Sequence, residues 1–167
     1  MARRFRGESR HKVDAKGRVS IPSLFRRILE AGDPDWTDGL RPQVVIVYGD
    51  PRRKFLECYT MEAIEEIDRK IESKPRGSIE RQMLEMTFNV QSHPTEVDND
   101  GRIVLPQKLR EKIGLTDEAL FVGSGEKFRI WNPDTYETEE MARAIARFEE
   151  LPPDFDVASL LDGSLED

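Results

Sequence analysis

The sequence repeats one motif, and this duplication constrains the fold more than any other feature. Residues 13–29 read VDAKGRVSIPSLFRRIL, and residues 97–113 read VDNDGRIVLPQKLREKI. Aligned without a gap, the segments match at polar, turn-forming and apolar positions: Asp14 with Asp98, Gly17 with Gly101, Arg18 with Arg102, Pro22 with Pro106, and Arg26 with Arg110. Such self-similarity indicates two copies of one structural unit. Because each copy spans only about seventy residues, we expect both to share one core.

Each copy predicts a strand, a turn, a second strand and a short helix. Aspartate favours the turn through side-chain hydrogen bonds to the backbone, and glycine supplies the positive φ. Pro22 and Pro106 are expected in the first turn of the helix, and Gly32 and Gly114 at its end. Further strands are predicted at residues 44–48, 56–59, 120–122 and 128–131.

The remaining pattern predicts helices and divides the chain. Apolar residues recur at helical spacing from Met61 to Ile71 and from Met141 to Phe148, and Asn132-Pro133 is typical of a helix start. A short helix is expected from Ile79 to about Met86. We therefore predict a first repeat at residues 5–75, a linker helix at 76–89, a second repeat at 90–150 and a disordered acidic tail at 151–167.

Charge is distributed unevenly along the chain. The net charge is −7, which by itself argues against nucleic-acid binding. Residues 1–30, however, hold nine basic and three acidic side chains, whereas the last nineteen residues hold seven acids and no base. This asymmetry favours a basic working face and an acidic tail over a merely solvated N-terminus, although charge alone leaves both open.

Several functional classes find no support in the sequence. Cys58 is the only cysteine, which excludes an intrachain disulfide and suggests a small core residue. His11 and His93 lack zinc-ligand spacing and are interpreted as surface or turn residues. No catalytic constellation is evident, so we expect neither enzymatic activity nor a metal or cofactor. The longest apolar run is residues 44–48, far short of a membrane span, and we expect a cytosolic protein.

The duplicated motif resembles the MraZ family. The resemblance rests on Asp14-Ala-Lys-Gly-Arg18 with Ser20-Ile-Pro22, and on Asp98-Asn-Asp-Gly-Arg102 with Leu105-Pro106. Phe5-Arg-Gly7 and Val122-Gly123 also fit, and the similarity covers about residues 5–150. It implies an α+β, mainly β fold: an AbrB-like double-split β-barrel built from two swapped-hairpin units of one chain, with flanking helices.

The resemblance also implies a function. Such a protein would assemble into a homo-oligomeric ring and bind double-stranded DNA at short direct repeats upstream of its own operon, the division and cell-wall cluster. It would typically repress that operon and associate with the nucleoid. The Asp-x-x-Gly-Arg turns would form the DNA-binding face.

Seven basic residues are candidates for DNA contact. Arg18 is expected to project from the hairpin tip and pair with guanine, because arginine can bond both O6 and N7 of that base. Lys16 is expected to contact phosphate. The same basic strip would include Arg4, Arg6, Arg10 and Lys12, with a smaller contribution from Arg102 because Asp100 replaces Lys16 in the second copy. The alternative is that Arg18 merely pairs with Asp14 to hold the turn.

The sequence admits three other interpretations. Residues 96–107 resemble half a calcium loop, but they begin with Glu96 and end with Gln107. Residues 123–127 suggest a phosphate loop but lack its spacing, so a tight turn is preferred. The main alternative function is a ring-forming scaffold that binds another protein and has only nonspecific affinity for DNA.

Overall fold

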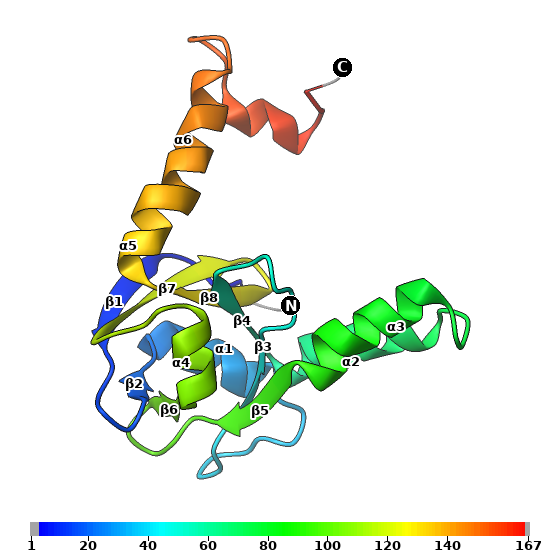
Figure 1. Cartoon of the computed structure of the whole chain (residues 1–167), viewed down its shortest axis with the longest axis vertical. Coiled ribbons are helices and arrows are strands. Elements are labelled where there is room, and N and C mark those ends of the chain that lie inside the picture. Colours follow the sequence, from blue (N-terminus) through cyan, green and yellow to red (C-terminus); the bar gives the residue numbers. More distant parts are fainter. Residues whose placement is uncertain (1–3, 166–167) are drawn as a thin grey trace. The chain divides into compact units, whose positions relative to one another are not determined.

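The computed structural model describes residues 4–165, and the chain divides after Pro133 into two compact units (Figure 1). Over its described residues, 4–133, the first unit contains eight strands: β1 (Glu8–Lys12), β2 (Arg18–Ser20), β3 (Gln43–Val47), β4 (Phe55–Tyr59), β5 (Ser92–Glu96), β6 (Arg102–Val104), β7 (Glu118–Ser124) and β8 (Lys127–Trp131). Six of them form an antiparallel sheet in the order β1-β7-β8-β4-β3-β5. The other two, β2 and β6, form a separate antiparallel ribbon.

Helices complete both units. The first contains α1 (Ser23–Ala31), α2 (Met61–Glu72), α3 (Ile79–Glu85), η1 (Met86–Val90) and α4 (Gln107–Lys112). Figure 1 shows α2 and α3 as an arm that extends away from the sheet. The second unit begins within α5 (Pro133–Thr135) and contains η2 (Tyr136–Met141), α6 (Ala142–Glu149) and η3 (Val157–Leu161). The structure thus describes a 3-10 helix within the acidic tail, while Glu166 and Asp167 lie outside the described residues.

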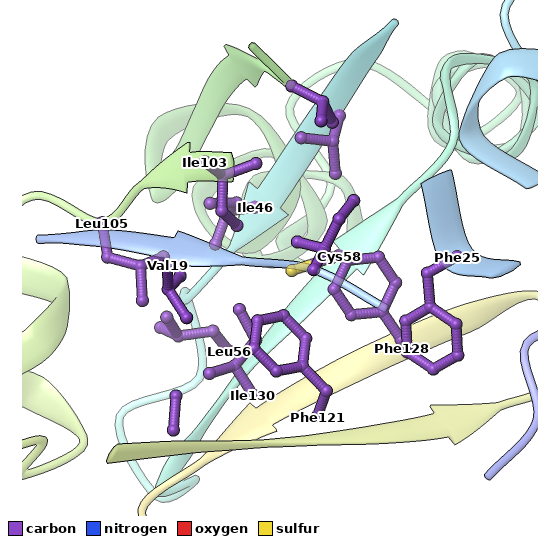
Figure 2. Close-up of a cluster of buried hydrophobic side chains, with 14 of the residues drawn as sticks. Val19, Phe25, Ile46, Leu56, Cys58, Ile103, Leu105, Phe121, Phe128 and Ile130 are labelled. Carbon is purple, nitrogen blue, oxygen red and sulfur yellow. The ribbon is translucent and has the colours of Figure 1, made fainter. Parts of the chain in front are cut away.

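One core joins the two sheets. Side chains from the ribbon, from the six-stranded sheet and from α1 point toward one another in Figure 2. Val19 of β2 and Ile103 of β6 are almost fully buried beside Ile46, Leu56 and Phe121. Neither half of the chain could bury these apolar faces alone, because the ribbon needs one strand from each half.

A second apolar cluster explains why β3 is apolar from Val44 to Val47, without alternation. Val44 and Ile46 face the main core, whereas Val45 and Val47 face a smaller cluster under α2 that includes Ile64. A strand covered on both faces loses the alternation of polar and apolar residues that a half-exposed strand shows. Thr60 caps the N-terminus of α2: its Oγ1 atom accepts a hydrogen bond from the backbone N–H of Ala63 at 3.1 Å.

The α+β, mainly antiparallel architecture confirms the predicted fold class, and burial of Cys58 confirms its place in the core. Two smaller predictions are wrong. Pro22 and Pro106 precede their helices, because their ψ values of 137° and 151° are extended rather than helical. Of the surface or turn positions predicted for His11 and His93, the turn positions are wrong, because both are partly exposed residues within strands. The ring of His11 lies edge-on to Phe121, and burial lowers its pKa.

Candidate nucleic-acid interface

The ribbon places one residue of each motif on a common outer face. Arg18 lies opposite Val104, and Ser20 lies opposite Arg102, while Val19 between them faces the core. Side chains alternate between the two faces of a strand, so Arg18, Ser20, Arg102 and Val104 share the outward side. A two-stranded ribbon fits the major groove of B-DNA, which is about 12 Å wide.

The turn at residues 14–18, termed turn 1, is held by Asp14. Its Oδ1 atom accepts hydrogen bonds from the backbone N–H groups of Lys16 at 3.0 Å and Arg18 at 2.9 Å. The N–H of Gly17 donates to the carbonyl of Asp14 at 2.9 Å, and Gly17 has a φ of 84°. The backbone N–H of Arg18 is the main cause of a lowered pKa at Asp14. The carboxylate therefore fixes the turn before any ligand arrives.

The turn at residues 98–102, termed turn 2, repeats this arrangement. Asp98 Oδ1 accepts the N–H groups of Asp100 and Arg102, both at 2.9 Å, and the N–H of Gly101 donates to the carbonyl of Asp98 at 3.0 Å. Burial tends to raise the pKa of Asp98, but the N–H groups of Arg102 and Asp100 and the nearby guanidinium charges outweigh it and leave that pKa lowered.

Each turn is also bonded to the opposite half of the chain. The N–H of Leu105 donates to the carbonyl of Gly17 at 2.8 Å, and the N–H of Ile21 donates to the carbonyl of Gly101 at 3.0 Å. Arg110 Nε donates to the carbonyl of Leu105 at 2.9 Å, beside Gly17. The strands on either side of turn 1 meet only at the Val13–Val19 bridge and then enter different sheets. Arg18 therefore begins a ribbon that both halves of the chain share, whereas the sequence predicted that it projects from the tip of a local hairpin.

Arg18 is paired with Asp14 in a way that leaves its guanidinium usable. Its Nε donates to Asp14 Oδ2 at 2.6 Å, and its side chain is 40% exposed. Within the described part of the chain, neither Nη atom has a further hydrogen-bond partner. Guanine recognition uses two parallel N–H donors, so a carboxylate that holds Nε leaves such a fork available. The two interpretations of Arg18 are therefore compatible.

Arg102 differs from Arg18 although its backbone is equivalent. Its Nη2 donates to Asp100 Oδ2 at 3.1 Å, and its Nε lies 3.6 Å from Asp98 Oδ2, covered from solvent and without a hydrogen bond. Its side chain is 34% exposed. One terminal nitrogen is thus occupied within turn 2, whereas Lys16 at the equivalent position of turn 1 cannot accept a hydrogen bond from Arg18.

The other predicted basic residues follow β1 rather than gathering at the ribbon. Arg10 and Lys12 lie on the exposed side of β1, next to β7, where Arg10 approaches Glu118 at 3.8 Å. Arg4 and Arg6 flank Phe5, which bridges to Gly125 in the turn between β7 and β8, at the other end of β1. Lys16 is exposed in turn 1. The structure therefore places Lys16, Arg18 and Arg102 in the turns and at the ribbon, whereas Arg4, Arg6, Arg10 and Lys12 lie before or within β1. Arg3 lies outside the described residues.

Two arginines near turn 2 were not among the predicted site residues. Arg41 donates to Glu96 Oε1 at 3.0 Å and to Asn99 Oδ1 at 3.3 Å. The guanidinium of Arg26 borders Gly101, as Arg110 borders Gly17. The matched positions of Arg26 and Arg110 in the repeat were a usable signal, whereas nothing in the sequence connects Arg41 with a turn 58 positions later.

Residues that suggested other chemistry have structural roles. Residues 123–127 form the turn between β7 and β8, with Ser124 opposite Lys127 and a positive φ at Gly125, as the tight-turn interpretation predicted. Asp98, at the third place of the calcium-like segment, caps turn 2. Across residues 4–165, no three His, Cys, Asp or Glu side chains are grouped to hold a metal ion. No helix in that same range is long and apolar enough to cross a membrane.

Comparison with known proteins identifies the family. Residues 90–151 match the family model described as "MraZ protein, putative antitoxin-like". The chain is 65% identical to "Transcriptional regulator MraZ" of Ruegeria pomeroyi, over 98% of both chains. A protein of the same name from Coxiella burnetii is 31% identical over 93% of this chain and 99% of that protein. The chain therefore belongs to the MraZ family of transcriptional regulators.

Proposed function

We propose that this protein regulates transcription by binding DNA sequence-specifically, with the β2–β6 ribbon in the major groove and Arg18 reading a guanine. The observation that carries the proposal is the guanidinium of Arg18, fixed through Nε by Asp14 with both Nη atoms unbonded to described residues. A side chain ordered before binding loses less conformational entropy when it bonds a base. Lys16 follows as a phosphate contact, and Arg10 and Lys12 extend the positive surface along β1.

The proposed target is a set of short direct repeats upstream of the protein's own division and cell-wall operon, which the protein would repress. The resemblance to the MraZ family supports this target. A protein that binds it would be in the cytoplasm, associated with the nucleoid. A chain with net charge −7 needs help to bind DNA tightly. A ring that presents several ribbons to tandem sites gains that affinity through effective concentration.

Exposed apolar side chains support self-association. Ile79, Met83 and Met86 are spaced four and three residues apart along α3 and η1, and each is more than half exposed, as is Val90. Residues at that spacing share one helix face. Exposed apolar patches often mark protein contacts. Analytical ultracentrifugation measures the mass of the oligomer. Met83→Glu should lower that mass, whereas the control Arg76→Ala, in the loop between α2 and α3, should leave it unchanged.

The test of the function is a salt-dependent binding titration with the DNA upstream of the gene and with a scrambled fragment. Wild type, Arg18→Ala and the control Arg76→Ala are compared; Arg76 is an equally charged, exposed residue between α2 and α3. We expect wild type and Arg76→Ala to prefer the native fragment with a steep salt dependence, and Arg18→Ala to lose that preference.

Equal affinity for native and scrambled DNA at low salt would overturn the proposal. That result, combined with salt-insensitive binding of a protein partner, would favour the alternative of a ring-forming scaffold with only nonspecific DNA affinity. Both functions require oligomers, so the ultracentrifugation result alone does not distinguish them.

A further inference from the structure

Resting on the proposed function, we infer that Val104 recognises the 5-methyl group of thymine in an A·T pair next to the G·C pair contacted by Arg18. The observation is the composition of the outer ribbon face. Of its four side chains, Arg18, Ser20 and Arg102 are polar, and Val104 alone is apolar. Val104 is 46% exposed and lies directly opposite Arg18.

The hydrophobic core of the protein does not need the side chain of Val104. Its neighbours Ile103 and Leu105, which are 1% and 0% exposed, provide the contribution of this segment to the core. The equivalent position in the first half of the chain is Ser20, which is also exposed and opposite an arginine. The ribbon therefore folds with a polar residue at this position, and valine adds an apolar group to a face otherwise suited to polar contacts.

The chemistry of the major groove provides a match for that group. Thymine is the base that presents a methyl group there, and small apolar side-chain groups contact it. Directly opposed residues in an antiparallel pair have Cβ atoms about 4.5–5.5 Å apart, and stacked base pairs are about 3.4 Å apart. An arginine and a valine that face each other across the ribbon can therefore reach adjacent base pairs.

This assignment makes each ribbon directional. One end presents Arg18 with Val104, and the other presents Arg102 with Ser20, so a half-turn that exchanges β2 and β6 does not reproduce the same chemistry. A directional reader distinguishes a site from its inverse. Copies of the chain arranged head to tail would then prefer direct over inverted repeats.

The experiment replaces thymine by deoxyuridine, one position at a time, in the native upstream fragment. This change removes the methyl group and keeps the hydrogen-bonding groups of the base. We expect wild type to bind about four-fold more weakly at the contacted position, the change that corresponds to one buried methyl group. Val104→Ser should bind the unmodified fragment with that reduced affinity and should not respond to deoxyuridine there.

Three further variants sharpen the test. Leu40→Ser removes an exposed apolar side chain in the loop before β3 and should keep the wild-type response. Val104→Thr retains a methyl group and a β-branched side chain and should keep most of the response, even if Val104→Ser folds poorly. Ser20→Val should create a second deoxyuridine-sensitive position beside the base pair near Arg102.

The outcomes separate this inference from the proposed function. If wild type does not prefer the native fragment, the proposed function itself fails. If wild type prefers that fragment and loses the preference with Arg18→Ala, but no deoxyuridine weakens binding, the assignment of Val104 is wrong. It is equally wrong if Val104→Ser still binds more weakly when deoxyuridine replaces that thymine, or if Val104→Thr no longer does.

Discussion

Turn 1 and turn 2 have nearly the same backbone but different surroundings. The hydrogen bond between the ends of the turn is 3.1 Å from the N–H of Asp14 to the carbonyl of Arg18 and 2.9 Å from the N–H of Asp98 to the carbonyl of Arg102. The bonds to the aspartate Oδ1 atoms agree more closely. Turn 1, however, contains one carboxylate and two cations, whereas turn 2 contains two carboxylates and one cation. Aspartate and glycine thus determine the shape of the turn, and the residue before the glycine determines whether a terminal nitrogen of the arginine is bonded within the turn.

The largest difference we expect concerns stability. Both Gly17 and Gly101 have positive φ, which costs an L-residue about 1–2 kcal/mol. A Cβ at Gly17 would in addition overlap the carbonyl oxygen of Leu105, whereas a Cβ at Gly101 would find its nearest neighbour at 3.6 Å. Gly17→Ala should therefore lower the free energy of unfolding by about 3 kcal/mol, and Gly101→Ala by about 1 kcal/mol.

Urea denaturation followed by circular dichroism, at one fixed protein concentration, measures both values. Equal losses would show that the contact of Gly17 with the opposite half does not constrain turn 1 more tightly than turn 2.

The next difference concerns DNA affinity. Loss of a bidentate arginine–guanine contact costs about 1–3 kcal/mol, so Arg18→Ala should weaken binding of the native fragment about 100-fold. Arg102→Ala should weaken it about 10-fold or less, because Asp100 already occupies one of its terminal nitrogens. Binding titrations at a single salt concentration test this ranking, and equal losses would contradict it.

Changing the charge of the residue before the turn glycine should reduce the difference between the contributions of the two turns to DNA affinity. Asp100→Lys gives turn 2 the residue type that turn 1 has, frees Arg102 Nη2 and removes a carboxylate from the surface that we propose faces phosphate. We expect about a five- to ten-fold gain in affinity and a salt dependence steeper by about one unit. Lys16→Asp is the matched reverse change and should reduce both quantities. A gain without any change in salt dependence would exclude phosphate contact by the new lysine.

The smallest effect should come from deletion of the acidic tail, whose charge we expect to influence DNA binding by both turns equally. Deleting residues 152–167 removes negative charge and should raise affinity for scrambled DNA about two- to three-fold at low salt, since salt screens such repulsion. The ratio between the Arg18→Ala and Arg102→Ala losses should stay the same. A changed ratio would mean that the tail interacts with one turn selectively.

Local sequence patterns predicted the elements better than their pairing. The Asp-x-x-Gly-Arg motif indicated both turns because aspartate and glycine determine them through bonds within five residues. The divergence of β1 and β2 into different sheets was not predictable in this way, because it depends on pairing Glu8 with Val122 and Arg18 with Val104. Local spacing contains no information about such distant partners.

The candidate site shows the same limit. Arg18, Lys16 and Arg102 were found because they belong to the motif itself. The position of Arg41 beside Asn99, and the role of Asp100 in holding Arg102, follow from tertiary contacts and side-chain rotamers. Matching Arg26 with Arg110 indicated a shared role, but not that each lies against the turn of the other half.

The exchange of strands between the halves has a consequence for synthesis. The ribbon requires β6, and β1 requires β7, so the N-terminal half must wait for residues far along the chain before it can complete its pairing. Such non-local pairing folds slowly, while a ribosome adds about 5–20 residues per second. A nascent chain that ends before Arg102 has no ribbon. If the ribbon binds DNA as we propose, a product truncated before Arg102 lacks the binding element and cannot compete with the full-length protein for the same sites.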